Sequence, residues 1–344
     1  MSRFDPADPV LECRLCPKGC VLAPGKRGDC RVRYNAGGGM LKTMVYGNPC
    51  SLHIDPVEKK PLFHFLPGSE TFSLATAGCN LHCLYCQNWQ ISQADPEDLR
   101  TYPLPPRDLV ATARARGCPS ISYTYTDPVI FYEYCFDSAV LAREAGLSNV
   151  LVTAGYINEE PLRELLPYID AANVDIKGFD EGFYRKVTTG ELKPVLRAVE
   201  LMVSAGVEVE ITNLVVPTLN DTPRMIADLC RWVARVPGPQ TPLHFSRFWP
   251  THKLSGLPPT PEATLLEAAT IARDAGLLHV YLGNLPGGGH QDTLCPSCKK
   301  ALIKRRGYTI VEYHLEGNRC PACGAEVTGR FWPPGQRPPQ TDEE

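Results

Sequence analysis

Short apolar segments alternate with longer amphipathic segments from about residue 62 to residue 286. The short segments are rich in β-branched and aromatic residues and predict strands at 71–76, 121–125, 149–153, 173–176, 208–216, 243–248 and 278–282. The segments between them predict helices at 106–116, 128–145, 159–166, 193–205, 223–236 and 261–275. Strands that alternate with helices indicate an α/β fold with a mostly parallel sheet.

The number of these units and the way their helices end favour a barrel. Gly146, Gly206 and Gly276 each follow a predicted helix, a position where glycine commonly ends one. Six or seven β/α units in this length fit an incomplete (β/α)6-type barrel better than a two-domain dinucleotide-binding protein. No G-x-G-x-x-G sequence follows a predicted strand, which further weakens the dinucleotide-binding alternative.

The two ends of the chain differ from this middle in composition. Residues 1–61 are irregular and cysteine-rich and are predicted to form an N-terminal lobe, followed by the barrel at 62–286. Residues 287–332 carry two C-x-x-C pairs around a short β-like segment and are predicted to form a zinc-ribbon-like module. Residues 333–344 are rich in proline and acidic residues and are predicted to be disordered.

Charge and hydropathy exclude several classes of partner. The chain has 344 residues, of which 43% are hydrophobic and 21% charged, as in ordinary globular proteins. Its net charge of −3 provides no basic excess for binding nucleic acid or an anionic membrane. No apolar run reaches the roughly 18–20 residues of a membrane span, and the first residues do not resemble a signal peptide. We therefore expect a cytoplasmic protein.

The fifteen cysteines are the most unusual feature of the composition. In a reducing compartment, clustered cysteines more often bind metal than form disulfides. The central group, Cys79, Cys83 and Cys86, directly follows the first predicted strand. A four-iron cluster normally takes four thiolates, so three cysteines leave one iron open for the amine and carboxylate of S-adenosylmethionine. A zinc site completed by His82 is the alternative.

Two further groups of four cysteines lie near the chain ends. The C-terminal group predicts zinc, with an auxiliary iron–sulfur cluster or free thiols as alternatives; it consists of Cys295, Cys298, Cys320 and Cys323. The N-terminal group predicts a structural zinc site, with an auxiliary iron–sulfur cluster as the alternative; it consists of Cys13, Cys16, Cys20 and Cys30.

Several segments together resemble a known enzyme family. They are CRLCPKGC at 13–20, DPVEKKPLFHFLPGS at 55–69, TAGCNLHCLYCQNWQIS at 76–92, YTYTDPVIFYEY at 123–134, NVDIKGF at 173–179 and LHFSRFWP at 243–250. The chain resembles the radical S-adenosylmethionine (SAM) superfamily and, within it, the radical enzyme of the AmmeMemoRadiSam system, a group similar to pyruvate formate-lyase activating enzymes. The resemblance implies a [4Fe-4S] cluster that cleaves S-adenosylmethionine reductively. The 5′-deoxyadenosyl radical would abstract hydrogen from a substrate that the sequence does not identify.

The resemblance also implies which residues at the strand ends contact S-adenosylmethionine. They are Tyr125, Thr126, Asp127, Thr153, Asp175, Lys177 and Arg247. Ala154 and Trp249 depart from the pattern of related enzymes, which carry Asn and His there. Each residue has a structural alternative: Asp127 can cap the next helix, Asp175 and Lys177 can form an ordinary ion pair, and Arg247 can be structural, as can His244.

Other expectations concern partners. A flavodoxin or ferredoxin as reductant follows from the resemblance, as do Memo-like and Amme-like partner proteins. Lys59 and Lys60 form either a basic site for a donor or acidic substrate, or a solvated loop anchored by neighbouring phenylalanines. The alternative to an enzyme is a metal-stabilised binding or electron-transfer protein without radical chemistry.

Overall fold

A computed structural model describes residues 8–285 and 289–336. Most of the tail predicted to be disordered lies outside the described residues, as does the predicted boundary at 286/287. The description below covers the described ranges.

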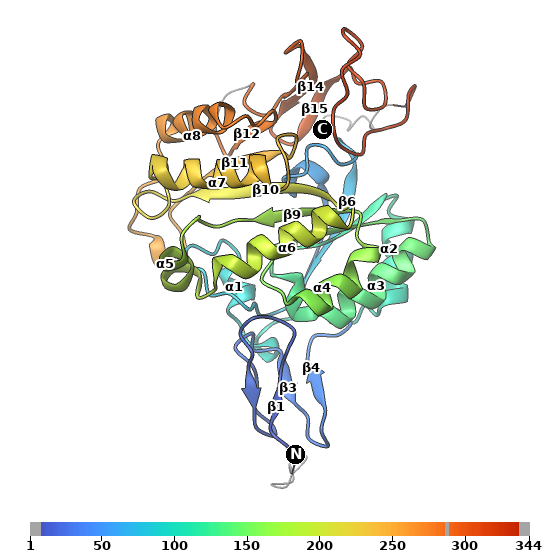
Figure 1. Cartoon of the computed structure of the whole chain (residues 1–344). Coiled ribbons are helices and arrows are strands. Elements are labelled where there is room, and N and C mark those ends of the chain that lie inside the picture. Colours follow the sequence, from blue (N-terminus) through green and yellow to red (C-terminus); the bar gives the residue numbers. More distant parts are fainter. Residues whose placement is uncertain (1–7, 286–288, 337–344) are drawn as a thin grey trace.

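An eight-stranded sheet forms the centre of the molecule (Figure 1). Seven consecutive strands run parallel in sequence order: β6 (Glu70–Ala75), β7 (Ser120–Tyr123), β8 (Ser148–Thr153), β9 (Ala171–Asp175), β10 (Glu208–Val215), β11 (Leu243–Arg247) and β12 (Val280–Gly283). These strands confirm the predicted α/β class and the mainly parallel sheet. The (β/α)6-type barrel remains a prediction.

The eighth strand, β5 (Ser51–Pro56), is antiparallel to β6 and was not predicted. It comes from the segment predicted to be the N-terminal lobe, so that segment contributes a strand to the central sheet. The pattern of apolar residues did not predict this strand, because β5 lies at the edge of the sheet and its Ile54 is 38% exposed. Without a buried apolar face, a strand carries little sequence signal.

Helices alternate with the strands along the chain, close to their predicted positions. They are α2 (Pro106–Ala115), α3 (Tyr132–Glu144), α4 (Glu159–Leu165), α6 (Leu192–Ser204), α7 (Pro223–Arg235) and α8 (Glu262–Asp274). The predicted helix at 128–145 starts with a 3-10 turn (Pro128–Phe131), and Asp127 caps that turn. Among the described residues, no helix combines the length and apolarity that crossing a bilayer requires.

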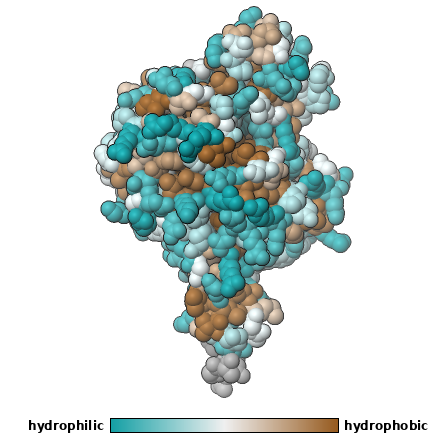
Figure 2. All heavy atoms as spheres, in the orientation of Figure 1, coloured by the Kyte–Doolittle hydropathy of each residue, from teal (hydrophilic) through white to brown (hydrophobic). Residues whose placement is uncertain are grey.

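Small antiparallel hairpins lie at opposite ends of the molecule (Figure 1). The N-terminal end pairs β1 (Leu11–Glu12) with β2 (Val21–Leu22), and β3 (Arg33–Asn35) with β4 (Leu41–Thr43). The C-terminal end is a three-stranded sheet of β13 (Thr293–Leu294), β14 (Ala301–Arg306) and β15 (Thr309–Tyr313). Figure 2 shows apolar side chains gathered on the narrow N-terminal end, where Val21 and Met40 are exposed. A core this small cannot bury its own apolar residues, as expected where metal ligands replace part of a core.

Candidate active site

A cavity of about 630 Å³ lies at the carboxyl ends of the parallel strands. Residues at the ends of β7 to β12 line it, together with the loop after β6 and part of the 58–63 segment. Because both Lys60, next to β5, and Tyr281, on β12, line it, the sheet curves around the cavity. Loops at the carboxyl ends of strands are where this class of fold places its active sites, and the volume suits a small-molecule ligand.

The loop that carries Cys79, Cys83 and Cys86 forms one wall of this cavity. Two backbone N–H groups hold it in place: His82 donates to the Thr188 carbonyl at 2.9 Å, and Leu84 donates to the Val187 carbonyl at 2.9 Å. Asn80 fixes the loop from another side, since its Nδ2 donates to the Tyr156 carbonyl at 2.8 Å. The loop is therefore bound to the framework, while none of its three thiols forms a disulfide; Cys86 Sγ lies 3.2 Å from Ser92 Oγ.

Glycine is required just before the first cysteine of this loop. Gly78 has φ +88°, and a β-carbon there would lie 2.4 Å from the Cys30 carbonyl oxygen. Only a residue without a side chain allows the N-terminal segment to approach the loop so closely. The backbone thus brings the N-terminal cysteines next to the central group.

The thiols of the central group sit in a buried environment. Burial raises the pKa of Cys79 well above its ordinary value and raises the pKa of Cys83 to about 12. A metal that binds them must therefore displace protons. His82 does not complete a zinc site here, because its Nδ1 lies 2.6 Å from Gln93 Oε1 and its Nε2 lies 3.0 Å from Asp29 Oδ2.

Six of the seven residues predicted to contact S-adenosylmethionine line the same cavity: Tyr125, Thr126, Asp127, Thr153, Asp175 and Lys177. The exception is Arg247. Residues 244 and 246 of β11 line the cavity, and alternation along the strand turns Arg247 to the other face. There its Nε donates to the Thr260 carbonyl at 2.8 Å, and its guanidinium lies 4.7 Å from the centre of the Trp249 ring.

Asp127 joins the ends of two strands. Its Oδ1 accepts hydrogen bonds from the Val129 N–H at 3.1 Å and the Thr153 hydroxyl at 3.0 Å, and its Oδ2 accepts from the Ala154 N–H at 2.9 Å. The capping role considered from the sequence is thus present. Burial raises the pKa of Asp127, although these donors oppose the shift.

Asp175 and Lys177 form an ion pair on the cavity wall. Their Nζ–Oδ2 distance is 3.1 Å, and both face the cavity as strand alternation predicts. Burial alone would lower the pKa of Lys177, but Asp175 and the neighbouring Cys83 thiol raise it well above its ordinary value. Lys177 therefore supplies a permanent positive charge beside the cysteine loop.

A second basic group in the cavity is Lys60. We expected a solvated loop or a basic docking site at Lys59 and Lys60, yet the Lys60 side chain is only 2% exposed. Its Nζ lies 2.5 Å from Asp55 Oδ2 and 4.5 Å from the centre of the Tyr125 ring. Burial lowers the pKa of Lys60 to about 8, against the opposing effect of Asp55. The unpredicted strand β5 explains the difference, because it places Asp55 opposite β6.

Tyr125 adopts a strained conformation between these groups. Its φ is +63°, which is uncommon for a residue with a side chain. Its hydroxyl donates to Asp55, and its carbonyl accepts from Asn88 Nδ2 at 2.8 Å. Strain of this kind persists only where surrounding bonds fix it and is common at functional sites.

The sequence analysis did not identify a buried carboxylate on a central strand of the sheet. Glu210 on β10 is fully buried; its Oε2 lies 2.7 Å from His244 Nε2, and its Oε1 accepts the His64 N–H at 2.7 Å. His244 in turn lines the cavity. A charged residue in the middle of the predicted strand 208–216 was the signal that could have identified Glu210.

Two buried hydroxyls in the cavity wall have no partner within the described chain. They are Tyr85 Oη and Thr212 Oγ1, both on residues that line the cavity. Buried polar atoms are nearly always hydrogen-bonded. The cavity is therefore suited to a ligand that carries polar groups of its own.

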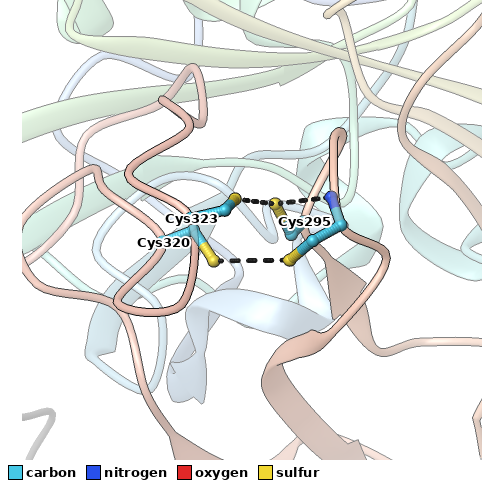
Figure 3. Close-up of side chains that lie close together, drawn as sticks. Cys295, Cys320 and Cys323 are labelled. Atoms are coloured by element: carbon cyan, nitrogen blue, oxygen red, sulfur yellow. Dashed lines mark hydrogen bonds between the residues drawn. The ribbon is translucent and has the colours of Figure 1, made fainter.

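The C-terminal cysteines form a separate site (Figure 3). The Sγ atoms of Cys295 and Cys323 are 3.5 Å apart, those of Cys298 and Cys320 are 3.7 Å apart, and all four lie within 4.8 Å of one another. Burial opposes ionisation of Cys295, but hydrogen bonds from the backbone of Cys298 and from neighbouring groups outweigh it and lower the pKa to about 6. This arrangement can bind one metal ion.

The N-terminal cysteines line a second, smaller pocket. All four, Cys13, Cys16, Cys20 and Cys30, contribute to its wall. Asn80 from the central cysteine loop also lines it. The pocket therefore borders the loop that forms the wall of the main cavity.

Comparisons with known proteins agree with this architecture. The sequence model of the Radical SAM superfamily matches residues 73–233, which include the central cysteine loop. An uncharacterized protein of Methanocaldococcus jannaschii is 45% identical over 322 residues, covering 93% of this chain and 96% of the relative.

Two further similarities are more distant. A pyruvate formate-lyase-activating enzyme of Clostridium pasteurianum is 30% identical over 169 residues, covering 46% of this chain and 67% of that enzyme. The crystal structure of a radical SAM methyltransferase from Sphaerobacter thermophilus has the same fold, with a TM-score of 0.51 at 14% identity over 65% of this chain and 68% of that one. The sequence match, the relative and the parallel sheet that presents three cysteines to one cavity lead to one conclusion: the chain belongs to the radical SAM superfamily.

Proposed function

We propose that this protein is a radical SAM enzyme resembling glycyl-radical-activating enzymes, with Cys79, Cys83 and Cys86 holding a [4Fe-4S] cluster. The observation that carries the proposal is the placement of these three thiols on the wall of a cavity that also presents six predicted contacts for S-adenosylmethionine. When bound, the cluster supplies the electron that cleaves S-adenosylmethionine to methionine and a 5′-deoxyadenosyl radical. The protein's own task is to bind, orient and shield.

The polar residues of the cavity divide this task between them. Lys177 carries a positive charge suited to the carboxylate of S-adenosylmethionine. Asp127 already accepts three hydrogen bonds from the protein, so it holds the ends of β7 and β8 in place and presents the carboxylate as a rigid acceptor. The unpartnered hydroxyls of Tyr85 and Thr212 remain available to polar groups of a ligand. The walls of the cavity, from the cysteine loop to the turn between β14 and β15, would help to keep a reactive radical from water and other bonds.

The substrate is proposed to carry an anionic group. Lys60 lines the cavity with Tyr125 beside it and, paired with Asp55, provides a second cationic group. Gly307 and Tyr308, from the turn between β14 and β15, also line the cavity. A wall from the C-terminal sheet makes the cavity better suited to a small molecule than to a protein loop. Memo-like and Amme-like proteins are the proposed partners, and a flavodoxin or ferredoxin is the proposed reductant.

Zinc is proposed for the C-terminal site. With Zn–S bonds of about 2.3 Å, tetrahedral geometry separates neighbouring sulfurs by about 3.8 Å. The distances of 3.5 and 3.7 Å between paired sulfurs agree with that spacing. The site closes the C-terminal sheet, so its role is structural.

The central test measures 5′-deoxyadenosine. The protein is purified without oxygen, loaded with iron and sulfide, reduced with dithionite and supplied with S-adenosylmethionine. We expect 5′-deoxyadenosine by mass spectrometry, and we expect Cys79→Ala/Cys83→Ala/Cys86→Ala to reduce it at least 100-fold because the electron source is lost.

A matched control is Cys118→Ala, which removes a buried thiol away from the cavity and should retain most of the product. If fully iron-loaded protein yields no product even with Memo-like and Amme-like proteins present, the radical proposal fails. The protein would then be a metal-stabilised binding or electron-transfer protein.

A further inference from the structure

The three cysteine groups differ in how closely their sulfur atoms approach one another. In the C-terminal group all four sulfurs lie within 4.8 Å, the spacing of ligands around one ion. In the N-terminal group no three sulfurs meet that limit, although Cys13, Cys16, Cys20 and Cys30 all belong to the described residues. The central group does not meet it either. The N-terminal group therefore resembles the central group, which suits a cubane, and not the C-terminal group.

The N-terminal sulfurs are spread because they surround a pocket. Its wall contains the four cysteines together with apolar side chains, including Leu15 and Val129. A cluster of four irons and four sulfides holds its thiolates farther apart than a single zinc ion does. The apolar pocket that the four cysteines line, of about 20 Å³, is where such a cluster would lie.

The surroundings of the pocket suit an anionic cluster. The Asp29 N–H donates to Cys20 Sγ at 3.4 Å, and hydrogen bonds to sulfur are a common means of tuning iron–sulfur clusters. Lys18 and Arg33 line the pocket as well. Arg33 is only 6% exposed and pairs with Glu133 at 2.6 Å. Lys18 is paired in the same way with Asp29, at 2.9 Å, so each cation lies beside the cysteines together with a carboxylate partner.

The pocket also borders the central cysteine loop. Asn80, which follows Cys79, lines it, and Gly78 packs against the Cys30 carbonyl. We propose that Cys13, Cys16, Cys20 and Cys30 hold a second [4Fe-4S] cluster, which passes electrons to the cluster at Cys79, Cys83 and Cys86. The second half of this proposal rests on the proposed function. In each transfer the N-terminal cluster is oxidised from the +1 to the +2 state while the central cluster is reduced from +2 to +1. An external one-electron donor protein then reduces the N-terminal cluster again.

Metal content tests the second cluster without reference to activity. Iron, sulfide and zinc per chain are measured after anaerobic loading in the native protein, in Cys79→Ala/Cys83→Ala/Cys86→Ala and in Cys16→Ala/Cys20→Ala. With ~4 irons per cluster, we expect ~8 irons and ~1 zinc in the native protein, and ~4 irons and ~1 zinc in each variant. A central-site variant with almost no iron and ~2 zinc ions per chain would overturn the proposal. Cys230→Ala, which removes another buried cysteine, should match the native protein.

Electron paramagnetic resonance tests the contact between the clusters. After reduction with dithionite, the native spectrum should differ from the sum of the two variant spectra, because neighbouring paramagnetic clusters broaden each other's signals. A native spectrum equal to that sum would overturn the electron-transfer half. Failure of the proposed function is distinguishable: it would appear as missing 5′-deoxyadenosine in protein that still contains both clusters.

Discussion

The pKa values of several charged residues in this molecule depend on how deeply the fold buries their side chains. Glu208 begins β10, two residues before the buried Glu210. Burial, reinforced by Glu210, raises the pKa of Glu208 from 4.5 to about 8, although Arg330 opposes the shift. Lys60 shows the opposite case, in which burial lowers the pKa of a cation to about 8. In both residues the charged form is the one that the fold disfavours.

Glu208 makes the stability depend on pH. Its folded pKa of about 8 exceeds its ordinary 4.5, so the folded chain binds more protons between these values. Stability is therefore lost as pH rises from about 4.5 to about 8. We expect Glu208→Gln to raise the free energy of unfolding at pH 9 by about 1–3 kcal/mol and to leave it nearly unchanged at pH 4.5. Urea denaturation at both pH values measures this, with the exposed Glu267→Gln as control. An equal effect at both pH values would contradict the pKa shift.

At the scale of elements, glycines decide where two segments can touch. Gly78 has φ +88°, and its position allows the N-terminal segment to lie against the central cysteine loop. Gly117, after α2, has φ +71°, but a β-carbon at this position would point into open space. Both glycines have a positive φ and they differ in packing, so they form a matched pair.

Alanine at the two positions separates the two effects. Gly117→Ala should cost about 1 kcal/mol, the cost of a left-handed conformation alone. Gly78→Ala adds a clash with the Cys30 carbonyl and should cost about 2–4 kcal/mol. It should also reduce iron uptake, because the N-terminal segment must move away from the loop. Denaturation curves and iron content check both, and equal costs at the two sites would show that the close approach is absent.

At the scale of the whole molecule, one buried arginine joins the C-terminal sheet to the segment before β6. Arg305 on β14 is buried; its Nη2 donates to the Phe63 carbonyl at 2.8 Å, and its Nε lies 3.6 Å from Glu58 Oε1. Its Nη1 donates to Thr293 Oγ1 at 2.8 Å. Burial raises the pKa of Glu58 to about 7, against the opposing effect of Arg305. Through Phe63 and Glu58, this arginine fixes the segment that brings Lys60 to the cavity.

Removing this arginine should leave Glu58 buried without its partner. We expect Arg305→Met to lower the free energy of unfolding by about 3–5 kcal/mol at pH 8. Combining it with Glu58→Gln should restore at least about half of that loss, because no buried charge is left unpaired. A double-mutant cycle by denaturation measures the coupling. The exposed neighbour Arg306→Met should cost less than about 0.5 kcal/mol, and additive effects of the first two changes would refute the pairing.

The sequence by itself determined the alternation of strands and helices and the central cysteine loop. Both depend on local information: apolar periodicity for the elements, and close spacing for Cys79, Cys83 and Cys86. Strand alternation also placed Asp175 and Lys177 on one wall, as the structure has them. The cap formed by Asp127 was predictable because capping involves only neighbouring residues.

Only the tertiary structure decided which side chains share the cavity. Lys60 lines the cavity and pairs with Asp55 of β5, an edge strand without an apolar pattern in its sequence. Glu210 on β10 contacts His244 on the neighbouring strand β11. Arg247 does not line the cavity, because alternation along β11 directs its side chain to the other face of the sheet. The sulfur spacing that sets the C-terminal cysteine group apart from the other two also depends on how its two C-x-x-C pairs pack together. Register and burial arise from contacts across the fold, and residue spacing along the chain carries no record of them.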